Sequence, residues 1–316
     1  MAGWPVVVRA QQRERVRRIG ALMNFAADDA EGQTRLAAFL RGLQNAGWER
    51  GRNLQLDVRW GTGDAGLYSK YAMELIALAP EVVLASGTPA ARAVQKASRA
   101  VPIVFATAAD PVGAGLVENL ARPNGNVTGF TAFSYNIGGK WLDLLLQIAP
   151  STMRVSIVRD PEAPAGIGQF GTIQAVAPSM KMVLRAIDSR DPDDIERGMT
   201  EIAGETHSGL IVTQNASVLF HRKLIIALAE KYRLPAVYAA RTFIDDGGLL
   251  SYGANLSDNY QRAAGYVDRI LKGTRAGELP IQEPTTFELI INLKTANAIG
   301  LKVPASLLAL ADEVIE

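Results

Sequence analysis

The fold is decided by the stretch of residues 81–111, which reads EVVLASGTPAARAVQKASRAVPIVFATAADP. Residues 82–85 form a short apolar run rich in valine, which predicts a buried strand. Residues 90–100 have helix-forming composition, and residues 103–106 predict a second buried strand. A strand, a helix and a second strand in succession predict a right-handed βαβ unit within a parallel sheet.

The residues between the first of these strands and the helix suit an anion. Ser86, Gly87 and Thr88 form a hydroxyl–glycine–hydroxyl turn, which leaves backbone N–H groups free to bind a phosphate or a carboxylate. The second strand ends near Thr107 and Asp110, which adds a carboxylate. Because ligands bind beyond the carboxyl ends of strands in open α/β sheets, these two strand ends suit a zwitterion. Helix capping by Ser86 and the start of another helix at Asp110 are the alternative explanation.

Composition limits the classes of function that the chain can have. The chain has 316 residues, of which 48% are hydrophobic, so it can bury the cores of two lobes. Its 33 Lys and Arg residues balance 32 Asp and Glu residues, which argues against a nucleic-acid partner. There is no cysteine, and His207 and His221 are the only histidines, which excludes disulfides and a histidine-rich metal site. No apolar run approaches the ~20 residues that span a bilayer.

The pattern of strands and helices occurs twice along the chain. Residues 154–160 resemble residues 18–24 in kind, since each segment has a basic residue, a short apolar strand and a polar end. Residues 209–238 then repeat the layout of residues 82–105, including a proline that opens the second strand. The chain therefore looks like an internal duplication of a doubly wound α/β unit. We expect α/β architecture, with two doubly wound parallel-sheet lobes joined by three crossovers.

The expected domain boundaries follow from this duplication and from two later segments. Residues 247–253 and 279–284 each suit a place where the chain crosses from one lobe to the other. We predict a signal remnant or linker at 1–17, a first lobe from 18–129 plus 254–282, and a second lobe from 130–253 plus 283–316. Helices are further predicted over residues 34–46, 112–120, 139–149, 218–232 and 258–271.

The first 18 residues do not resemble part of the fold. Residues 2–10 are mostly apolar and end in small side chains before Gln11, which is typical of the end of an export signal cleaved after Ala10. This indicates a periplasmic protein. The arginines among the first 18 residues favour a solvated linker over a nucleic-acid arm, and they are Arg9, Arg13, Arg15, Arg17 and Arg18.

Several short segments carry a more specific signal, and they are 85–90, 102–106, 110–117, 121–129, 247–253, 266–273 and 284–296. In these segments the chain resembles the substrate-binding proteins of ABC transporters, in the group whose known members bind aromatic amino acids. The resemblance covers about residues 18–316 in register. It implies the periplasmic-binding-protein type I fold, a ligand enclosed between two lobes, export, and docking on a membrane permease. Relatives carry an Asn-Pro-type loop after the first strand of the second lobe, whereas residues 159–164 here are more charged.

A binding protein of this kind needs no catalytic residue, cofactor or metal, only ligand contacts. We expect Ser86 and Thr88, with the backbone N–H groups of their turn at Gly87, to hold a ligand carboxylate. We expect Asp110 to pair with the ammonium group, because a charge desolvated between closed lobes needs a partner.

The remaining candidates lie at or just past predicted strand ends, and they are Asn24, Phe25 and Thr107 in the first lobe and Asp160, Asn215, Tyr238 and Arg241 in the second. Phe25 or Tyr238 can stack on an aromatic ring of the ligand. Each candidate has a structural alternative. Phe25 and Tyr238 can belong to the core, Arg241 can pair with Asp245 or Asp246, and Asn215 can cap its helix.

Two other classes of protein compete with this interpretation. An α/β enzyme could use Asp110, Asp160 and Glu162 as an acid–base pair, but no nucleophile elbow, P-loop, G-x-G-x-x-G turn or metal-ligand cluster is present in the sequence. A transcription regulator would need a helix-turn-helix before Ile19, where the residues lack an apolar helical period. We therefore predict the solute-binding component of an ABC importer. An aromatic amino acid is the favoured ligand, and a branched aliphatic amino acid or an amine-free aromatic or other small carboxylate stays open.

Overall fold

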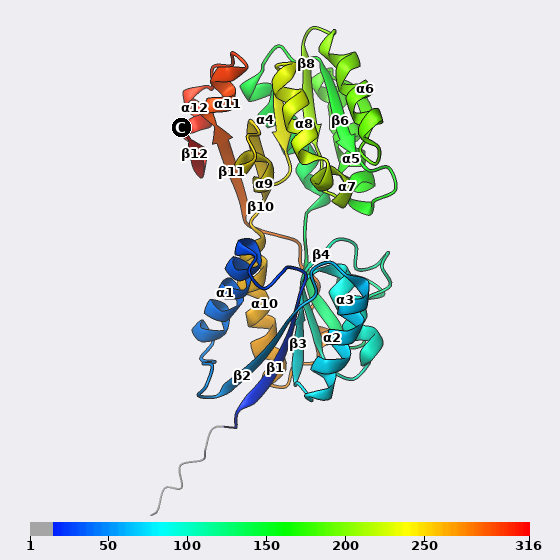
Figure 1. Cartoon of the computed structure of the whole chain (residues 1–316), viewed down its shortest axis with the longest axis vertical. Coiled ribbons are helices and arrows are strands. Elements are labelled where there is room, and N and C mark those ends of the chain that lie inside the picture. Colours follow the sequence, from blue (N-terminus) through cyan, green and yellow to red (C-terminus); the bar gives the residue numbers. More distant parts are fainter. Residues whose placement is uncertain (1–14) are drawn as a thin grey trace, which may run out of the picture.

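Two β-sheets form the framework of the chain, one in each of two lobes (Figure 1). The computed structural model describes residues 15–316, so the predicted signal remnant before Gln11 lies outside the described residues. Within them, the first sheet has five strands in the order β2-β1-β3-β4-β5, and the second has seven in the order β12-β11-β10-β9-β8-β6-β7.

The first lobe contains the N-terminal strands and a helix from the C-terminal third of the chain. Its strands are β1 (Arg17–Met23), β2 (Leu54–Trp60), β3 (Val82–Ala85), β4 (Ile103–Ala108) and β5 (Val127–Thr131). Its helices are α1 (Ala30–Asn45), α2 (Ala65–Ala77), α3 (Gly87–Ala97) and α10 (Leu256–Leu271), followed by the 3₁₀ turn η3 (Ala276–Glu278).

The second lobe contains the middle of the chain and its end. Its strands are β6 (Arg154–Arg159), β7 (Val183–Asp188), β8 (Ser208–Val212), β9 (Ala236–Tyr238), β10 (Leu250–Ala254), β11 (Phe287–Asn292) and β12 (Glu313–Ile315). Its helices are α4 (Gly138–Ile148), α5 (Pro164–Val176), α6 (Pro192–Ala203), α7 (Ala216–Phe220), α8 (Arg222–Lys231), α9 (Arg241–Asp245), α11 (Leu293–Ala298) and α12 (Ala305–Leu308), with the 3₁₀ turns η1 (Tyr135–Ile137) and η2 (Ala177–Met180).

Sheet order shows the internal duplication directly. The order β7-β6-β8-β9-β10 in the second lobe repeats the order β2-β1-β3-β4-β5 in the first, and all of these neighbours run parallel. This is the doubly wound arrangement, in which ligands bind where the strand order reverses. The second sheet is not wholly parallel, however, because β11 pairs antiparallel with β10 and β12 follows β11 in parallel.

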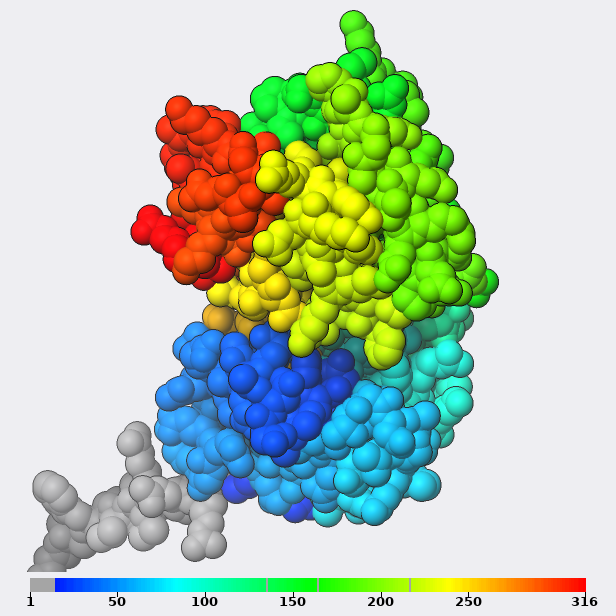
Figure 2. Space-filling view, turned by 45° about the horizontal axis from the view of Figure 1, so that its top comes forward, coloured from blue at the N-terminus to red at the C-terminus, as the bar shows by residue number. Residues whose placement is uncertain are grey.

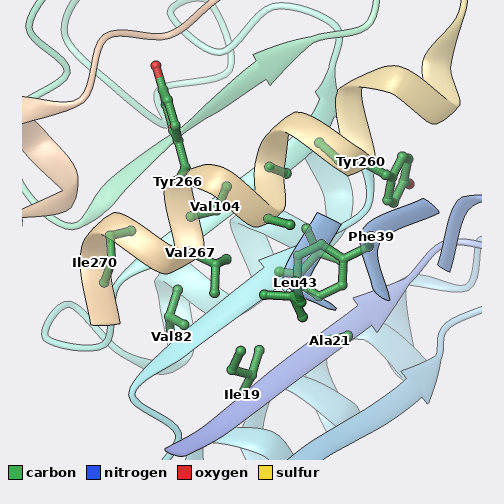
Figure 3. Close-up of a cluster of buried hydrophobic side chains, with 14 of the residues drawn as sticks. Ile19, Ala21, Phe39, Leu43, Val82, Val104, Tyr260, Tyr266, Val267 and Ile270 are labelled. Carbon is green, nitrogen blue, oxygen red and sulfur yellow. The ribbon is translucent and has the colours of Figure 1, made fainter. Parts of the chain in front are cut away.

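Helices cover both faces of the first sheet. Helices α1 and α10 lie on one face and α2 and α3 on the other (Figure 1). Figure 3 shows side chains from α1 and α10, such as Phe39 and Val267, directed at Ile19, Ala21 and Val82 on the strands. All five of these side chains are fully buried. Burial of such side chains contributes about 1.5–3 kcal/mol each for the larger ones, so α10 is integral to this lobe although it comes late in the chain.

The chain passes between the lobes three times, and hydrogen bonds join the three connections. The first leaves β5, the second follows β10, and the third leads from Gln282 to β11. The backbone N–H of Thr131 donates to the Gln282 carbonyl at 2.9 Å, and that of Asn255 donates to the Thr286 carbonyl at 3.0 Å. The Asn259 side chain donates to the Thr131 carbonyl at 2.9 Å. The three connections therefore lie side by side.

Several predicted helices differ in detail from those in the structure. Helix α3 begins at Gly87 and not at Ala90, because a proline in the first helical turn sacrifices no intrahelical hydrogen bond. Residues 112–120 form turns and not a helix, since Gly113 and Gly115 weaken helical structure and Gly115 has a φ of +67°. The segment 218–232 is divided between α7 and α8 at His221.

Gly129 on β5 provides a test of how closely β5 packs against β4. A Cβ atom there would lie 2.0 Å from the Phe105 carbonyl oxygen on β4, and the φ of +149° is rare for other residues. We expect Gly129→Ala to destabilise the protein by about 1–3 kcal/mol in urea unfolding. Gly265→Ala is the control, because a Cβ there meets nothing within 4 Å. In the interior of a helix this change is stabilising by about 0.5–1 kcal/mol. Equal unfolding midpoints for the two variants would contradict the prediction.

Candidate functional site

The carboxyl ends of the parallel strands in the two sheets face each other. Helices α7 and α9 follow directly on β8 and β9, and they lie on the side of the second lobe that faces the first (Figure 1). Figure 2 shows yellow segments of the second lobe directly above the blue start of the first. Residues at the strand ends of both lobes therefore lie on opposed surfaces, which we call the facing edges.

Asn24, Ser86 and Tyr260 form a hydrogen-bonded chain at the facing edge of the first lobe. Strands β1 and β3 are neighbours, with Leu22 opposite Ala85, so the residues that follow them lie side by side. The Ser86 hydroxyl contacts Asn24 Oδ1 and the Tyr260 hydroxyl. Ser86 is fully buried and its side chain makes no capping bond to α3. Its hydroxyl is thus engaged inside the lobe, contrary to the expectation that it reaches a ligand.

The start of α3 brings further groups to the same place. Gly87 has a φ of +83°, and a Cβ atom there would lie 3.8 Å from Asn24 Nδ2 and 3.9 Å from the Thr107 carbonyl oxygen. Thr88 Oγ1 accepts from the Ala109 backbone N–H at 3.1 Å, which ties α3 to the loop after β4 and leaves the Thr88 proton available. Among the described residues Asn24 Nδ2 has no hydrogen-bond partner, so the site offers donors without an acceptor.

Asp110 is placed by a local turn. Its Oδ1 accepts from the Gly113 backbone N–H at 2.9 Å, which is the structural alternative that the sequence allowed. The side chain is half-exposed. A carboxylate has about four lone-pair positions, so this single bond leaves capacity for an ammonium group.

Phe25 lies between the core and the facing edge. It is half-buried and packs against the core of the first lobe. Arg35 on α1 places its guanidinium 4.8 Å from the Phe25 ring centroid and 5.9 Å from that of Tyr260. Arg35 Nε donates to Glu31 Oε1 at 2.7 Å. The two rings and the cation form one stacked cluster, which the sequence did not reveal.

In the second lobe, Asn215 and Asp160 serve local structure. Asn215 Oδ1 accepts from the Val218 backbone N–H at 2.9 Å and from the Ser217 hydroxyl at 2.8 Å, so it caps α7. Asp160 Oδ1 accepts from the Glu162 backbone N–H at 2.8 Å. Both lie after strand carboxyl ends, where caps and ligand contacts need the same polar residue types.

Tyr238 and Arg241 both have partners within the second lobe. Tyr238 is 1% exposed, and its ring stacks on Phe243 with the centroids 5.0 Å apart. Burial raises the pKa of the Tyr238 phenol well above its usual range. Arg241 binds Glu313 on β12, with Nη2 donating to Oε1 at 2.9 Å, and it pairs with Asp245 at 3.4 Å. Tyr238 is thus a core residue and Arg241 pairs with Asp245, which are the structural alternatives that the sequence allowed for them, and Arg241 also anchors the last strand.

Two side chains of the second lobe were not predicted as ligand contacts, and each has a hydrogen-bond donor without an acceptor. Arg159 ends β6, its Nε is buried, and its guanidinium lies 4.4 Å from the Phe170 ring centroid. Gln169 is fully buried, and its Oε1 accepts from the Gln214 backbone N–H at 3.2 Å. Among the described residues, Arg159 Nε and Gln169 Nε2 have no partner. Arg159 could have been found from its position at a predicted strand end, but Gln169 gives no such signal.

Residues 15–316 contain neither a cluster of metal ligands nor a membrane-spanning helix. No group of three or more His, Cys, Asp or Glu side chains in that range could hold a metal ion. No helix in that range is long and apolar enough to cross a membrane.

Two doubly wound lobes with opposed strand ends and three connections define a two-lobed ligand-binding protein of the periplasmic-binding-protein type I class. The chain belongs to the ABC transporter substrate binding protein family, whose model matches residues 21–315. The predicted fold class and the resemblance are thus confirmed, and the family consists of substrate-binding proteins rather than enzymes.

Individual relatives are distant in sequence and similar in fold. The tyrosine-binding protein of Clostridioides difficile (strain R20291) is 21% identical over 266 residues, which cover 84% of this chain and 76% of the relative. The ligand-free, open structure of a substrate binding protein with adhesive properties from Clostridium difficile is 21% identical, with a TM-score of 0.82 over 95% of this chain and 99% of that one. A Streptococcus pneumonia protein in complex with L-Trp is 21% identical, with a TM-score of 0.76 over 95% and 100%.

The placement of Tyr238 in the core can be checked by two substitutions. Tyr238→Phe keeps the stacked ring, so we expect its affinity for any ligand to match that of the unchanged protein. Tyr238→Ala should destabilise the protein by about 3–5 kcal/mol in thermal or urea unfolding, as deletion of a buried aromatic ring does. A tenfold loss of affinity in the Phe variant would place the hydroxyl in the ligand site.

Proposed function

We propose that this protein is the extracytoplasmic solute-binding component of an ABC importer and that it binds a small amino acid, best an aromatic one, between its lobes. The observation that carries the proposal is the cluster of hydrogen-bond donors without acceptors at the facing edge of the first lobe. Asn24 Nδ2 lies beside Gly87 at the start of α3, where the first backbone N–H groups of a helix have no intrahelical partner.

A carboxylate satisfies these donors together. The Asn24 amide, the N–H groups of Gly87 and Thr88 and the Thr88 hydroxyl can all donate to it, and the positive end of the α3 dipole favours the negative charge. This refines the role expected of Ser86, which acts behind Asn24 rather than on the ligand. The Thr107 backbone carbonyl near Gly87 is an acceptor, so it suits the ammonium group of the ligand and not the carboxylate.

The remaining parts of an aromatic amino acid also find partners at the facing edge. Asp110, with spare acceptor capacity, suits the ammonium group, and Asp160 lies on the opposed edge. Phe25 presents a half-buried ring on which an aromatic side chain can stack. The tyrosine-binding and L-Trp-bound relatives support this choice of ligand.

Ligand binding is coupled to closure of the two lobes. A ligand that contacts both facing edges stabilises the closed state in proportion to its additional contacts there. The three connections, held side by side at Thr131, Asn255 and Gln282, suit bending as a hinge. Substrate-binding proteins of this family work outside the cytoplasm, and the permease of an ABC importer is the partner that we propose for the loaded protein.

A small carboxylate without an amine is the second candidate ligand. Arg159 favours it, because its buried Nε has no hydrogen-bond partner although the Asp188 carboxylate lies nearby on β7, and because Asp110 is already engaged with Gly113. No comparable observation supports an enzyme that would use the carboxylates on the facing edges.

A thermal-shift screen tests the function. The protein is unfolded and refolded to remove bound ligand, then heated with tyrosine, phenylalanine, tryptophan, leucine and a set of aromatic acids. A ligand at 100 times its Kd adds about 2.7 kcal/mol to the free energy of unfolding, so its melting temperature rises visibly. We expect the largest rise with an aromatic amino acid. No rise with any compound would overturn the proposal.

Asp110→Asn separates the two candidate ligands within the same screen. If the ligand has an ammonium group, the variant should lose about 1.5–3 kcal/mol of binding free energy, the contribution of a hydrogen bond to a charged group. If the ligand has no amine, binding should be unchanged or stronger. Asp143→Asn is the control, since it removes the same charge from an exposed ion pair with Lys140 on α4.

Arg159→Met tests the contribution of the second lobe. The substitution keeps an apolar stem over Phe170 and removes the donors, so we expect the Kd measured by calorimetry to rise about tenfold or more. Arg185→Met on the neighbouring strand β7 is the control, because Arg185 is exposed and pairs with Glu201 and Glu205. Equal affinities for the Arg159 variant and the unchanged protein would remove Arg159 from the ligand site.

A further inference from the structure

We propose that the second lobe has a further ligand site at the amino ends of its strands, and that this site binds a small organic carboxylate. A cavity of about 420 Å³ lies there. It is lined by residues 148–152, which lead into β6, by residues 207–208 at the start of β8, by residues 232–235 before β9, and by residues 301–302 after α11. Its volume is within the roughly 300–1,000 Å³ of sites that hold small molecules.

This cavity is separate from the facing edges. Strands β6, β8 and β9 run parallel, so their amino ends lie together on the side of the second lobe away from the first (Figure 1). The five residues of β8 span about 16 Å from one edge of the sheet to the other. A small ligand in the cavity cannot reach the facing edges, so this site is independent of the one proposed between the lobes.

The charges that line the cavity favour an anion. His207, Arg233 and Lys302 line it, and all three are exposed. Among the described residues no carboxylate forms an ion pair with any of them. Glu205 also lines the cavity, but arginines of β6 and β7 already neutralise its carboxylate, at 3.4 and 3.2 Å. The cavity therefore presents two permanent cations and a histidine without a counter-charge, which a carboxylate can supply.

The uncharged part of the lining favours an organic anion over an inorganic one. Pro150, Pro235 and Leu301 contribute apolar surface, and none of the three is fully buried. Ser151 is also exposed and adds a hydroxyl. An inorganic ion would leave the apolar surface in contact with water, whereas a molecule with an apolar body covers it. A carboxylate on a small apolar body therefore matches both parts of the lining.

Titration of ¹⁵N-labelled protein with sodium 3-phenylpropionate at constant ionic strength tests this site. The backbone amide signals of Ser151, His207 and Leu301 report on the cavity, and those of Asn24 and Thr88 report separately on the facing edge. We expect the cavity signals to shift saturably with a Kd of about 1–10 mM or tighter, which is usual for a ligand of this size. Inorganic phosphate and 3-phenylpropan-1-ol, which lack the apolar body and the charge respectively, should bind at least about fivefold more weakly.

Two substitutions remove the cations one at a time. Arg233→Gly is tolerated by the backbone, because Arg233 has a φ of +51°, in the left-handed region that favours glycine. We expect the Kd measured from the cavity signals to rise about three- to tenfold in Arg233→Gly and in Lys302→Met. Lys181→Gly is the matched control and should leave the Kd unchanged. Lys181 is a cation with a φ of +56° at the same edge of the sheet, before β7, but it does not line the cavity.

Three outcomes would overturn the site. The first is an absence of saturable shifts at the cavity signals. The second is binding of phosphate or of 3-phenylpropan-1-ol as tight as that of 3-phenylpropionate. The third is an equal Kd in the Arg233, Lys302 and Lys181 variants, because such a result reflects net charge alone or no contribution of these cations. Shifts at Asn24 and Thr88 without shifts at the cavity would support a ligand between the lobes and contradict the second site.

Discussion

The hydrogen bonds among Thr131, Asn255, Asn259, Gln282 and Thr286 hold the three interlobe connections together. The arrangement of both lobes follows from these bonds. Because the chain leaves the first lobe after β5 and returns after β10, α10 completes the first core although it comes late in sequence. The same connections set the two facing edges opposite each other. A ligand site built from two sheets can exist only if this bundle keeps their carboxyl ends opposed, and bundled connections suit a bending motion.

The facing edges carry many polar groups, but much of their capacity is used locally. Asn215 caps α7, and Asp110 and Asp160 each accept a backbone N–H of the following turn. This overlap has a physical origin. A strand end that meets a helix start exposes backbone N–H groups, and the side chains that satisfy those groups are also the ones that bind small ligands. Residue type at a strand end therefore does not separate a cap from a ligand contact.

Polar groups without a hydrogen-bond partner distinguish ligand contacts from helix caps better than residue type does. Asn24 Nδ2 in the first lobe and Arg159 Nε and Gln169 Nε2 in the second are donors that find no acceptor among the described residues. Arg159 Nε and Gln169 Nε2 are buried, and buried donors are rarely left unpaired, so these groups favour an anionic ligand between the lobes. The hydrogen bond from the Ser86 hydroxyl to Asn24 Oδ1 orients one of these donors in advance, which lowers the cost of binding.

Many of the strands and helices, the duplication and the two-lobed fold can be predicted from the sequence, because hydrophobic periodicity and glycine or proline punctuation act over a few residues. The turns at residues 112–120 and the elements α5, β7 and α6 were not predicted. The sequence also located most strand ends, including those at Asn24, Ser86 and Asp110. Only the tertiary structure decided what each side chain there contacts. Tyr238 was a reasonable ligand contact until its ring was found stacked on Phe243, and Ser86 until its hydroxyl was found bound to Tyr260. Contacts between residues separated by 174 positions leave no local pattern, since they depend on where the packing of α10 against the first sheet brings a side chain.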